Sequence, residues 1–162
     1  MSDIFSFLTE HAIPFQRFDH VAVFTCEESA KLPPMPGGDT KNLFLRDDKG
    51  KRHFLVTVGH EKTVDLKKLK DVLGVKGVSF ASPERLKQYL SVDPGSVTLL
   101  GLIHDRDRAV EVWIDEAVWS HEFIQCHPLV NTATLVIPRE GMEKFFEITK
   151  HQPHIADIPS RV

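Results

Sequence analysis

The chain has 162 residues, 41% of them hydrophobic, and a formal net charge of −3 at pH 7. This length and apolar content suffice for one core, so we expect a single domain over residues 1–162. The negative net charge argues against indiscriminate binding to nucleic acid backbones, which needs clustered Lys and Arg. We therefore expect no DNA partner.

The spacing of the cysteines and the hydropathy of the sequence indicate in which cellular compartment the protein resides. The two cysteines, Cys26 and Cys126, form no CxxC pair, so neither a disulfide framework nor a zinc knuckle is expected. The N-terminal residues lack the basic flank of a signal peptide, and no run approaches the roughly 18 to 20 apolar residues of a membrane span. We expect a soluble cytoplasmic protein, monomeric by default and without a membrane partner.

The first predicted elements are two short helices and a hairpin. Apolar residues at helical spacing in 4–8 precede Pro14, which ends the first helix. The segment "TCEESAKL" (25–32) carries a capping box before the irregular "PPMPGG" (33–38). The two strand-like runs of "KNLFLRDDKGKRHFLVTV" (41–58) flank a polar turn, which predicts a hairpin.

Two further helices and a series of strands are predicted next. The segments "DLKKLKDVLG" (65–74) and "SPERLKQYL" (82–90) each show a capping residue and an apolar helical face. Extended structure is predicted for "SVTLLGLI" (96–103), "AVEVWI" (109–114) and "EFIQCHPLVNTATLVI" (122–137).

The C-terminal part is predicted to be one helix and an irregular tail. Pro138 opens a helix in which Met142, Phe145 and Phe146 face inward, and residues 151–162 show no clear periodicity. The sum is an α+β domain with a mixed or antiparallel sheet surrounded by short helices.

Common catalytic motifs are missing from the sequence. The nine histidines show no HExxH or HxH spacing, so we expect no structural or catalytic metal and no cofactor. There is no G-x-S-x-G elbow of a serine hydrolase. Cys126 and His127 are adjacent on a predicted strand and point to opposite faces, so Cys126 is interpreted as a small core residue.

Three segments hold polar residues with two interpretations each. Lys41, next to Asn42, is either a solvated strand-edge lysine or an anchor for a phosphate or carboxylate. Gly95 and Gly101 either serve turns and bulges or let backbone amides approach a ligand. His127 is either a ligand-binding side chain or a partly buried histidine tied to a backbone group.

These segments, "TKNLFLRD" (40–47), "DPGSVTLLGL" (93–102) and "HPLVNTATLVI" (127–137), occur in an order and at separations that resemble the YbaK and prolyl-tRNA synthetase-associated editing family. The likeness is greatest to its freestanding prolyl-tRNA editing proteins. The resemblance implies a barrel-like sheet and hydrolysis, in trans, of alanine mischarged on proline-accepting tRNA. Such an enzyme is a second sieve for an amino acid small enough to enter a synthetase site built for proline. The implied partner is the tRNA 3′ end, with prolyl-tRNA synthetase as a further candidate.

The resemblance also implies roles for individual residues. In the family, the residue matching Lys41 helps to hold the tRNA 3′ end, and the residue matching Asn42 belongs to the same site. The residue matching His127 helps to hold or polarise the substrate. Backbone amides near Gly95 contact the aminoacyl group, where they can stabilise an oxyanion. The residues implied as catalytic are Lys41, His127 and Gly95, and those implied as substrate contacts are Asn42, Ser96, Thr98, Gly101 and Asn131.

One departure from the family pattern leaves alternatives open. Leu99 stands where the family loop has a proline, so the rejected amino acid is not fixed by the sequence. One alternative is a deacylase for another small mischarged amino acid, such as cysteine on proline-accepting tRNA. Another is a non-catalytic module that binds aminoacyl-tRNA or a synthetase. The general base is unassigned, and the lysines of 67–76 are interpreted as a solvated helix face or an acceptor-stem contact.

Overall fold

The computed structural model describes residues 4–20, 37 and 39–161. The predicted helix at 25–32 lies outside these residues, and so does the predicted loop at 33–38 apart from Gly37. No helix in the described part of the chain is long and apolar enough to cross a membrane.

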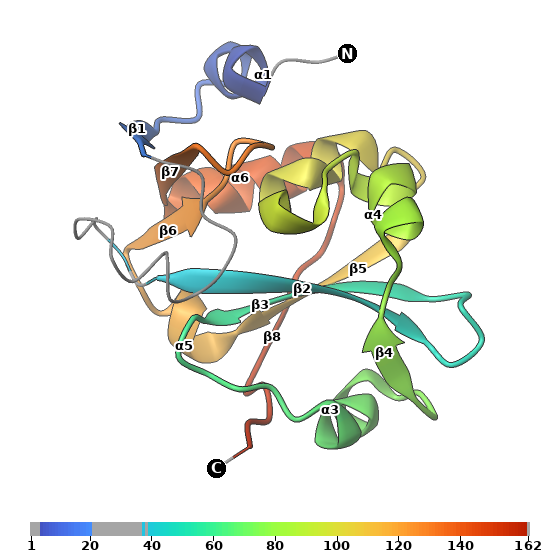
Figure 1. Cartoon of the computed structure of the whole chain (residues 1–162). Coiled ribbons are helices and arrows are strands. Elements are labelled where there is room, and N and C mark those ends of the chain that lie inside the picture. Colours follow the sequence, from blue (N-terminus) through green and yellow to red (C-terminus); the bar gives the residue numbers. More distant parts are fainter. Residues whose placement is uncertain (1–3, 21–36, 38, 162) are drawn as a thin grey trace.

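The strands form two sheets (Figure 1). The larger sheet has the order β4-β2-β3-β5-β8, in which β2 pairs antiparallel with β3 and β4, and β5 pairs parallel with β3 and β8. The smaller sheet is antiparallel and has the order β1-β7-β6. The strands are β1 (Gln16–Asp19), β2 (Thr40–Asp47), β3 (His53–Gly59), β4 (Val78–Phe80), β5 (Val110–Asp115), β6 (Phe123–Cys126), β7 (Ala133–Pro138) and β8 (His154–Ala156).

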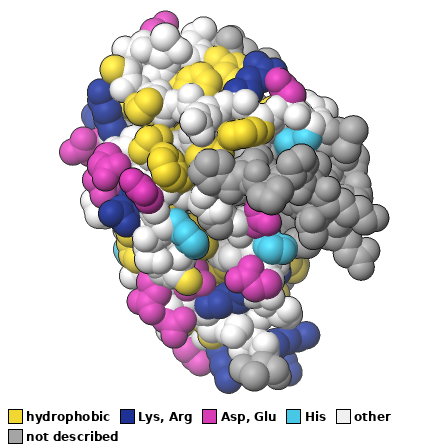
Figure 2. Space-filling model, turned by 90° about the vertical axis from the view of Figure 1, so that its left-hand side faces the viewer, with side chains coloured by type: hydrophobic (Ala, Val, Ile, Leu, Met, Phe, Trp, Pro, Cys, Tyr) yellow, Lys and Arg dark blue, Asp and Glu magenta, His cyan; other side chains and the backbone are white. Residues whose placement is uncertain are grey.

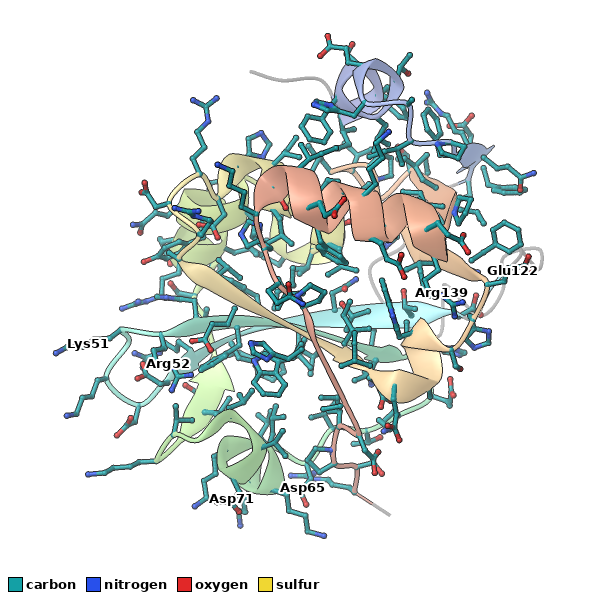
Figure 3. The ribbon with its side chains drawn as sticks, turned by 180° about the vertical axis from the view of Figure 1, so that it is seen from behind. Lys51, Arg52, Asp65, Asp71, Glu122 and Arg139 are labelled. Atoms are coloured by element: carbon teal, nitrogen blue, oxygen red, sulfur yellow. The ribbon has the colours of Figure 1, made fainter. Side chains whose placement is uncertain are left out.

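Short helices surround the sheets, which confirms the predicted α+β class. Ser82 caps the start of α4 as predicted, and Asp65 accepts amide hydrogen bonds at the start of α3 (Figure 3). Gly74 ends α3 with a φ of 72°, a left-handed conformation that favours glycine. The helices are α1 (Ile4–Glu10), α3 (Leu66–Leu73), α4 (Pro83–Leu90), α5 (Glu116–Trp119) and α6 (Arg139–Thr149), with 3-10 turns η1 (Pro94–Ser96) and η2 (Leu99–His104).

The two faces of the larger sheet belong to different hydrophobic clusters. One face, with Phe44 and Leu55, packs into the main core together with α1, α4, η2 and α6. The other face, with Leu45 and Val58, packs against α3 and Ile158 in a second cluster. Figure 1 shows α4 and α6 on one side of this sheet and α3 on the other. Adjacent residues of β2 therefore enter different environments, because side chains alternate along a strand.

The hairpin predicted for 41–58 is confirmed as β2 and β3, with Asn42 opposite Thr57. The strand predicted for 109–114 is confirmed as β5, and the helix after Pro138 is confirmed as α6 with Phe145 and Phe146 buried. Arg139, the first residue of α6, donates its amide hydrogen to the carbonyl of Glu122, which fixes the helix against the start of β6 (Figure 3).

The strand predicted for 96–103 is wrong, because this segment forms the 3-10 helix η2 after a short connection. The side chain of Thr98 caps it by accepting the amide hydrogen of Leu100. Leu99, Leu100 and Leu102 are all buried. A short, continuously apolar run does not reveal by periodicity whether it is a buried strand or a buried helix.

The long extended run predicted for 122–137 is divided. Residues 127–132 form a turn between β6 and β7, and Leu129 within it has a φ of 70°. His127 therefore lies in a turn and not in a strand. The β-branched residues of this stretch favour extended structure locally, but the antiparallel pairing of Cys126 with Leu135 requires the chain to reverse between them.

The tail predicted to be irregular from residue 151 contributes an edge strand. Residues His154–Ala156 form β8, which pairs with Trp113 to Asp115 of β5. His151 and Ile158 are buried on either side of it. A strand of three residues is too short to show a period, so its existence depends on pairing with a distant segment.

Candidate functional site

The start of β2 contacts residues 93–98 through Asn42. These residues contain η1 and are called the η1 segment. The Asn42 side-chain nitrogen donates a hydrogen bond of 3.3 Å to the carbonyl of Val97, and its oxygen accepts one of 2.6 Å from the Thr57 hydroxyl. Each bond uses part of the amide, which has two N–H donors and two acceptor lone pairs. Asn42 thus positions the η1 segment and still has one N–H available for a ligand.

The η1 segment places several amide groups close together. The Ser96 amide donates to the carbonyl of Asp93, and the Gly101 amide donates to the carbonyl of Thr98. These bonds do not involve the amides of Gly95 and Val97. The segment is therefore held in shape by its own turns and by Asn42, while backbone donors remain beside the start of β2.

The same end of β2 also touches the strand that leads to His127. The Thr40 hydroxyl donates a hydrogen bond of 3.3 Å to the carbonyl of Gln125 in β6. His127 follows two residues later, after the buried Cys126. The start of β2 thus contacts both the segment of η1 and the strand that leads into the turn of His127, although these segments are separated by tens of residues along the chain.

His127 is held so that one ring nitrogen remains available. Its Nδ1 lies 3.2 Å from the carbonyl oxygen of Ala133. A carbonyl only accepts hydrogen bonds, so Nδ1 carries the proton in the neutral ring and Nε2 is an acceptor. Nε2 has no hydrogen-bond partner among the described residues. Burial lowers the pKa of His127, the bond to Ala133 opposes this shift, and the nearby charge of His20 adds to it.

Sequence reasoning missed two residues of this region. His20 follows β1, and its Nε2 lies 2.9 Å from the hydroxyl of Thr134 in β7. Thr57 is buried in the middle of β3 and is visible only through the strand register that places it opposite Asn42. No local motif marks either position, because both gain their role from pairing with distant strands.

Lys41 leaves β2 on the face opposite to that of Asn42. It pairs with Val58, a member of the cluster that packs against α3, whereas Asn42 pairs with Thr57. The Lys41 ammonium has no hydrogen-bond or ion-pair partner among the described residues. The two neighbours therefore approach the site from the two sides of one strand, and Lys41 is not turned towards the η1 segment in the way Asn42 is.

Other residues implied as substrate contacts are placed differently. Thr98 is fully buried and caps η2, so it has no surface for a ligand. Gly101 is buried, and a Cβ there would lie 3.1 Å from the Leu90 Cβ, so this glycine serves the close packing of η2 on α4. Ser96 is largely buried in η1, and Asn131 is half-buried in the turn after His127.

Two further observations concern which side chains could act as a nucleophile or bind a metal ion. Burial raises the pKa of the Cys126 thiol to about 12, so this side chain is a core residue and not a nucleophile. In the described part of the chain no three His, Cys, Asp or Glu residues lie in a group that could hold a metal ion. A hollow of about 710 Å³ beside α6 is lined by none of the residues implied for the site.

Comparison with known proteins identifies the family of the chain. The sequence pattern of the aminoacyl-tRNA editing domain matches residues 20–145. The chain is 38% identical over 139 residues to the prolyl-tRNA editing protein ProX of Acetoanaerobium sticklandii, a match that covers 85% of this chain and 84% of the relative. It is also 38% identical to prolyl-tRNA synthetase associated domain-containing protein 1 of Danio rerio, covering 85% of this chain and 76% of that protein.

Solved structures share the fold at low sequence identity. One, described as a candidate trans-editing enzyme for prolyl tRNA synthetase, superposes with a TM-score of 0.67 and 18% identity over 91% of this chain and 87% of its own. Its sequence is too distant to carry more than the fold. The sequence match covers most of the chain and begins at His20, so the chain belongs to the aminoacyl-tRNA editing domain family.

Proposed function

We propose that this chain hydrolyses, in trans, the ester of alanine mischarged on proline-accepting tRNA. Family membership and the prolyl-tRNA editing relative support the class of reaction. The observation that carries the proposal is that the start of β2 is hydrogen-bonded both to the η1 segment, through Asn42, and to the strand that leads into the His127 turn, through Thr40. An oriented amide, backbone donors and a neutral imidazole can together bind and polarise an aminoacyl ester.

The residues present fit ester hydrolysis without a nucleophilic side chain. Water adds to the ester carbonyl carbon, negative charge develops on the carbonyl oxygen, and the terminal ribose oxygen leaves and takes up a proton. Backbone amides next to Gly95 are the donors available to the developing oxyanion, a contribution of several kcal/mol in other hydrolases. The Nε2 of neutral His127 can accept a hydrogen bond from the attacking water or from the amino group of the substrate.

The charge distribution favours recognition of the tRNA end by a few local contacts. On the face shown in Figure 2, Lys and Arg side chains are interspersed with acidic ones and do not gather into one basic area. Recognition of the long phosphate backbone would need such an area. In our proposal Lys41 meets a phosphate near the ester, and prolyl-tRNA synthetase supplies the mischarged tRNA.

The test is deacylation of one proline-accepting tRNA charged with alanine, cysteine or proline. We expect fast hydrolysis of the alanyl ester, slower hydrolysis of the cysteinyl ester and none of the prolyl ester above the uncatalysed rate. A preference for cysteine would assign the chain to the alternative deacylase class. Tight binding of the charged tRNA without any hydrolysis would instead make it a binding module.

A further inference from the structure

The most exposed large apolar side chain in the described part of the molecule is Phe80. It is 62% exposed, compared with 49% for Val130 and 41% for Ile155. Phe80 is the last residue of β4, a strand of only three residues at the edge of the larger sheet. A single exposed apolar residue is ordinary on a protein surface. A functional role for Phe80 therefore depends on where this residue lies in the sheet.

The strand register places Phe80 on the same sheet face as Lys41. Phe80 pairs with Leu45 of β2, and paired residues of neighbouring strands project to the same side. Leu45 and Lys41 are four residues apart, so alternation along the strand gives them the same side as well. The distance along β2 between these two positions is about 13 Å.

In the part of the chain that the structure describes, no strand covers the edge of β2 between these two residues. The pairing of β4 with β2 runs from Asp47 to Leu45, and the next residue after Phe80 contributes one more bond, from the Ala81 amide to the Phe44 carbonyl. No described strand pairs with β2 on this side at residues 40–43. An extended chain can therefore pass along this edge from the start of β2 to the ring of Phe80.

The helix next to β4 is rich in lysine. Figure 1 shows α3 next to β4, and the sequence of α3, LKKLKDVL, holds three lysines and one acid. Asp71, the one acid of the helix, points away from the sheet (Figure 3). Lys67, Lys68 and the nearby Lys76 are exposed. Cations beside an exposed aromatic ring match the two features of a single-stranded nucleic acid, its phosphates and its unstacked bases.

We propose that Phe80 is a stacking platform for an unpaired base of the tRNA 3′ end. The phosphate next to the ester lies at Lys41, the strand follows the open edge of β2, and a base upstream of the terminal nucleotide stacks on the Phe80 ring. This role rests on the proposed function and adds a contact that is independent of the rejected amino acid. It also gives the α3 lysines a partner, the acceptor strand beyond that base.

The test compares Phe80→Ala and Phe80→Trp in the whole protein on two substrates. One is alanyl-tRNA for proline, and the other is alanyl-adenosine, which carries the ester but no upstream nucleotide. Under single-turnover conditions we expect Phe80→Ala to raise the half-saturating enzyme concentration for the tRNA about tenfold, the loss typical of one stacked base. The rate at saturation and the hydrolysis of alanyl-adenosine should stay unchanged in Phe80→Ala. Phe80→Trp should bind the tRNA as tightly as the unsubstituted protein does.

Ile155→Ala is the matched control, because it removes another exposed apolar side chain, and it should leave both substrates unaffected. Quenching of the new tryptophan fluorescence of Phe80→Trp by uncharged tRNA reports stacking without any catalysis. Unchanged tRNA binding by Phe80→Ala, or an equal loss on alanyl-adenosine, overturns the platform. If the unsubstituted protein hydrolyses neither substrate, the proposed function fails, and the fluorescence measurement still decides whether Phe80 stacks on the tRNA.

Discussion

The start of β2 and the region where the C-terminal residues pack on the domain both contain partly or fully buried polar side chains. The two regions differ in how many hydrogen bonds these side chains make within the protein. We call the second region the C-terminal seam; it consists of Lys62, Asp105, Asp115, His151 and Ile158. In the seam, the His151 Nε2 lies 2.9 Å from the Asp105 carboxylate and its Nδ1 lies 2.9 Å from the Thr149 hydroxyl. Among the described residues, His127 has a hydrogen-bond partner on Nδ1 alone.

The lysines of the two regions differ in the same way. The Lys62 ammonium lies 2.8 Å from the Asp115 carboxylate and donates to the carbonyl of Ile158 at 2.7 Å, whereas Lys41 has no partner among the described residues. A polar group whose hydrogen bonds are complete fastens the chain, and one with an unused donor or acceptor can bind a substrate. Residues of the same type can therefore have different roles: Lys62 and His151 stabilise the fold, whereas Lys41 and His127 are available to a substrate.

The largest effect is expected in the seam. Asp105→Ala removes the partner of buried His151 and also the acceptor for the amides of Ala109 and Val110. Breaking a buried pair of this kind costs about 3 to 5 kcal/mol of unfolding free energy. Urea unfolding measures this loss, and the deacylation rate per folded molecule should not change. Asp107→Ala, at an exposed neighbouring position, is the control and should unfold like the original protein.

The opposite pattern is expected for His127→Ala. Loss of a positioned imidazole should reduce the single-turnover deacylation rate by about a hundredfold, the lower end of what general acid–base groups contribute. Stability should change little, because His127 makes a single hydrogen bond to the residues that the structure describes. His121→Ala replaces an exposed histidine and serves as the control. A variant that unfolds readily but deacylates normally when folded would place His127 with the seam.

A loss of rate that is similar to or smaller than that of His127→Ala is expected for Lys41→Ala. One charge-assisted contact to a phosphate is worth about 1.5 to 3 kcal/mol, or roughly ten- to more than a hundredfold if it is felt in the transition state. Lys49→Ala, in the exposed turn of the β2–β3 hairpin, should cost almost nothing. Equal single-turnover rates for the two variants would show that Lys41 is a solvated strand-edge residue.

Several elements could be predicted from the sequence because their signals are local. The cap and glycine of α3, the proline start of α4 and the hairpin turn each act within a few residues. The edge strand β8 and the role of Thr57 could not be predicted, since both depend on pairing with segments far away in the sequence. The sequence also left open which face of the sheet Lys41 joins, because that depends on the register with β3.

The smallest effect is expected from pH, and it tests the state of the His127 ring. Burial lowers the pKa of His127 below the ordinary value of 6.5, so the ring is already neutral at neutral pH. After subtraction of the uncatalysed rate, deacylation should therefore vary by less than about twofold between pH 7 and 8 and should fall only below about pH 6.5. In acid, the unfolded chain binds more protons at this site than the folded one, so stability falls in the same direction and the folded fraction must be followed. The acid limb attributed to His127 should disappear in His127→Ala. A tenfold fall in rate between pH 8 and 7 would show that a group other than His127 controls the rate, because burial holds the pKa of His127 below its ordinary value.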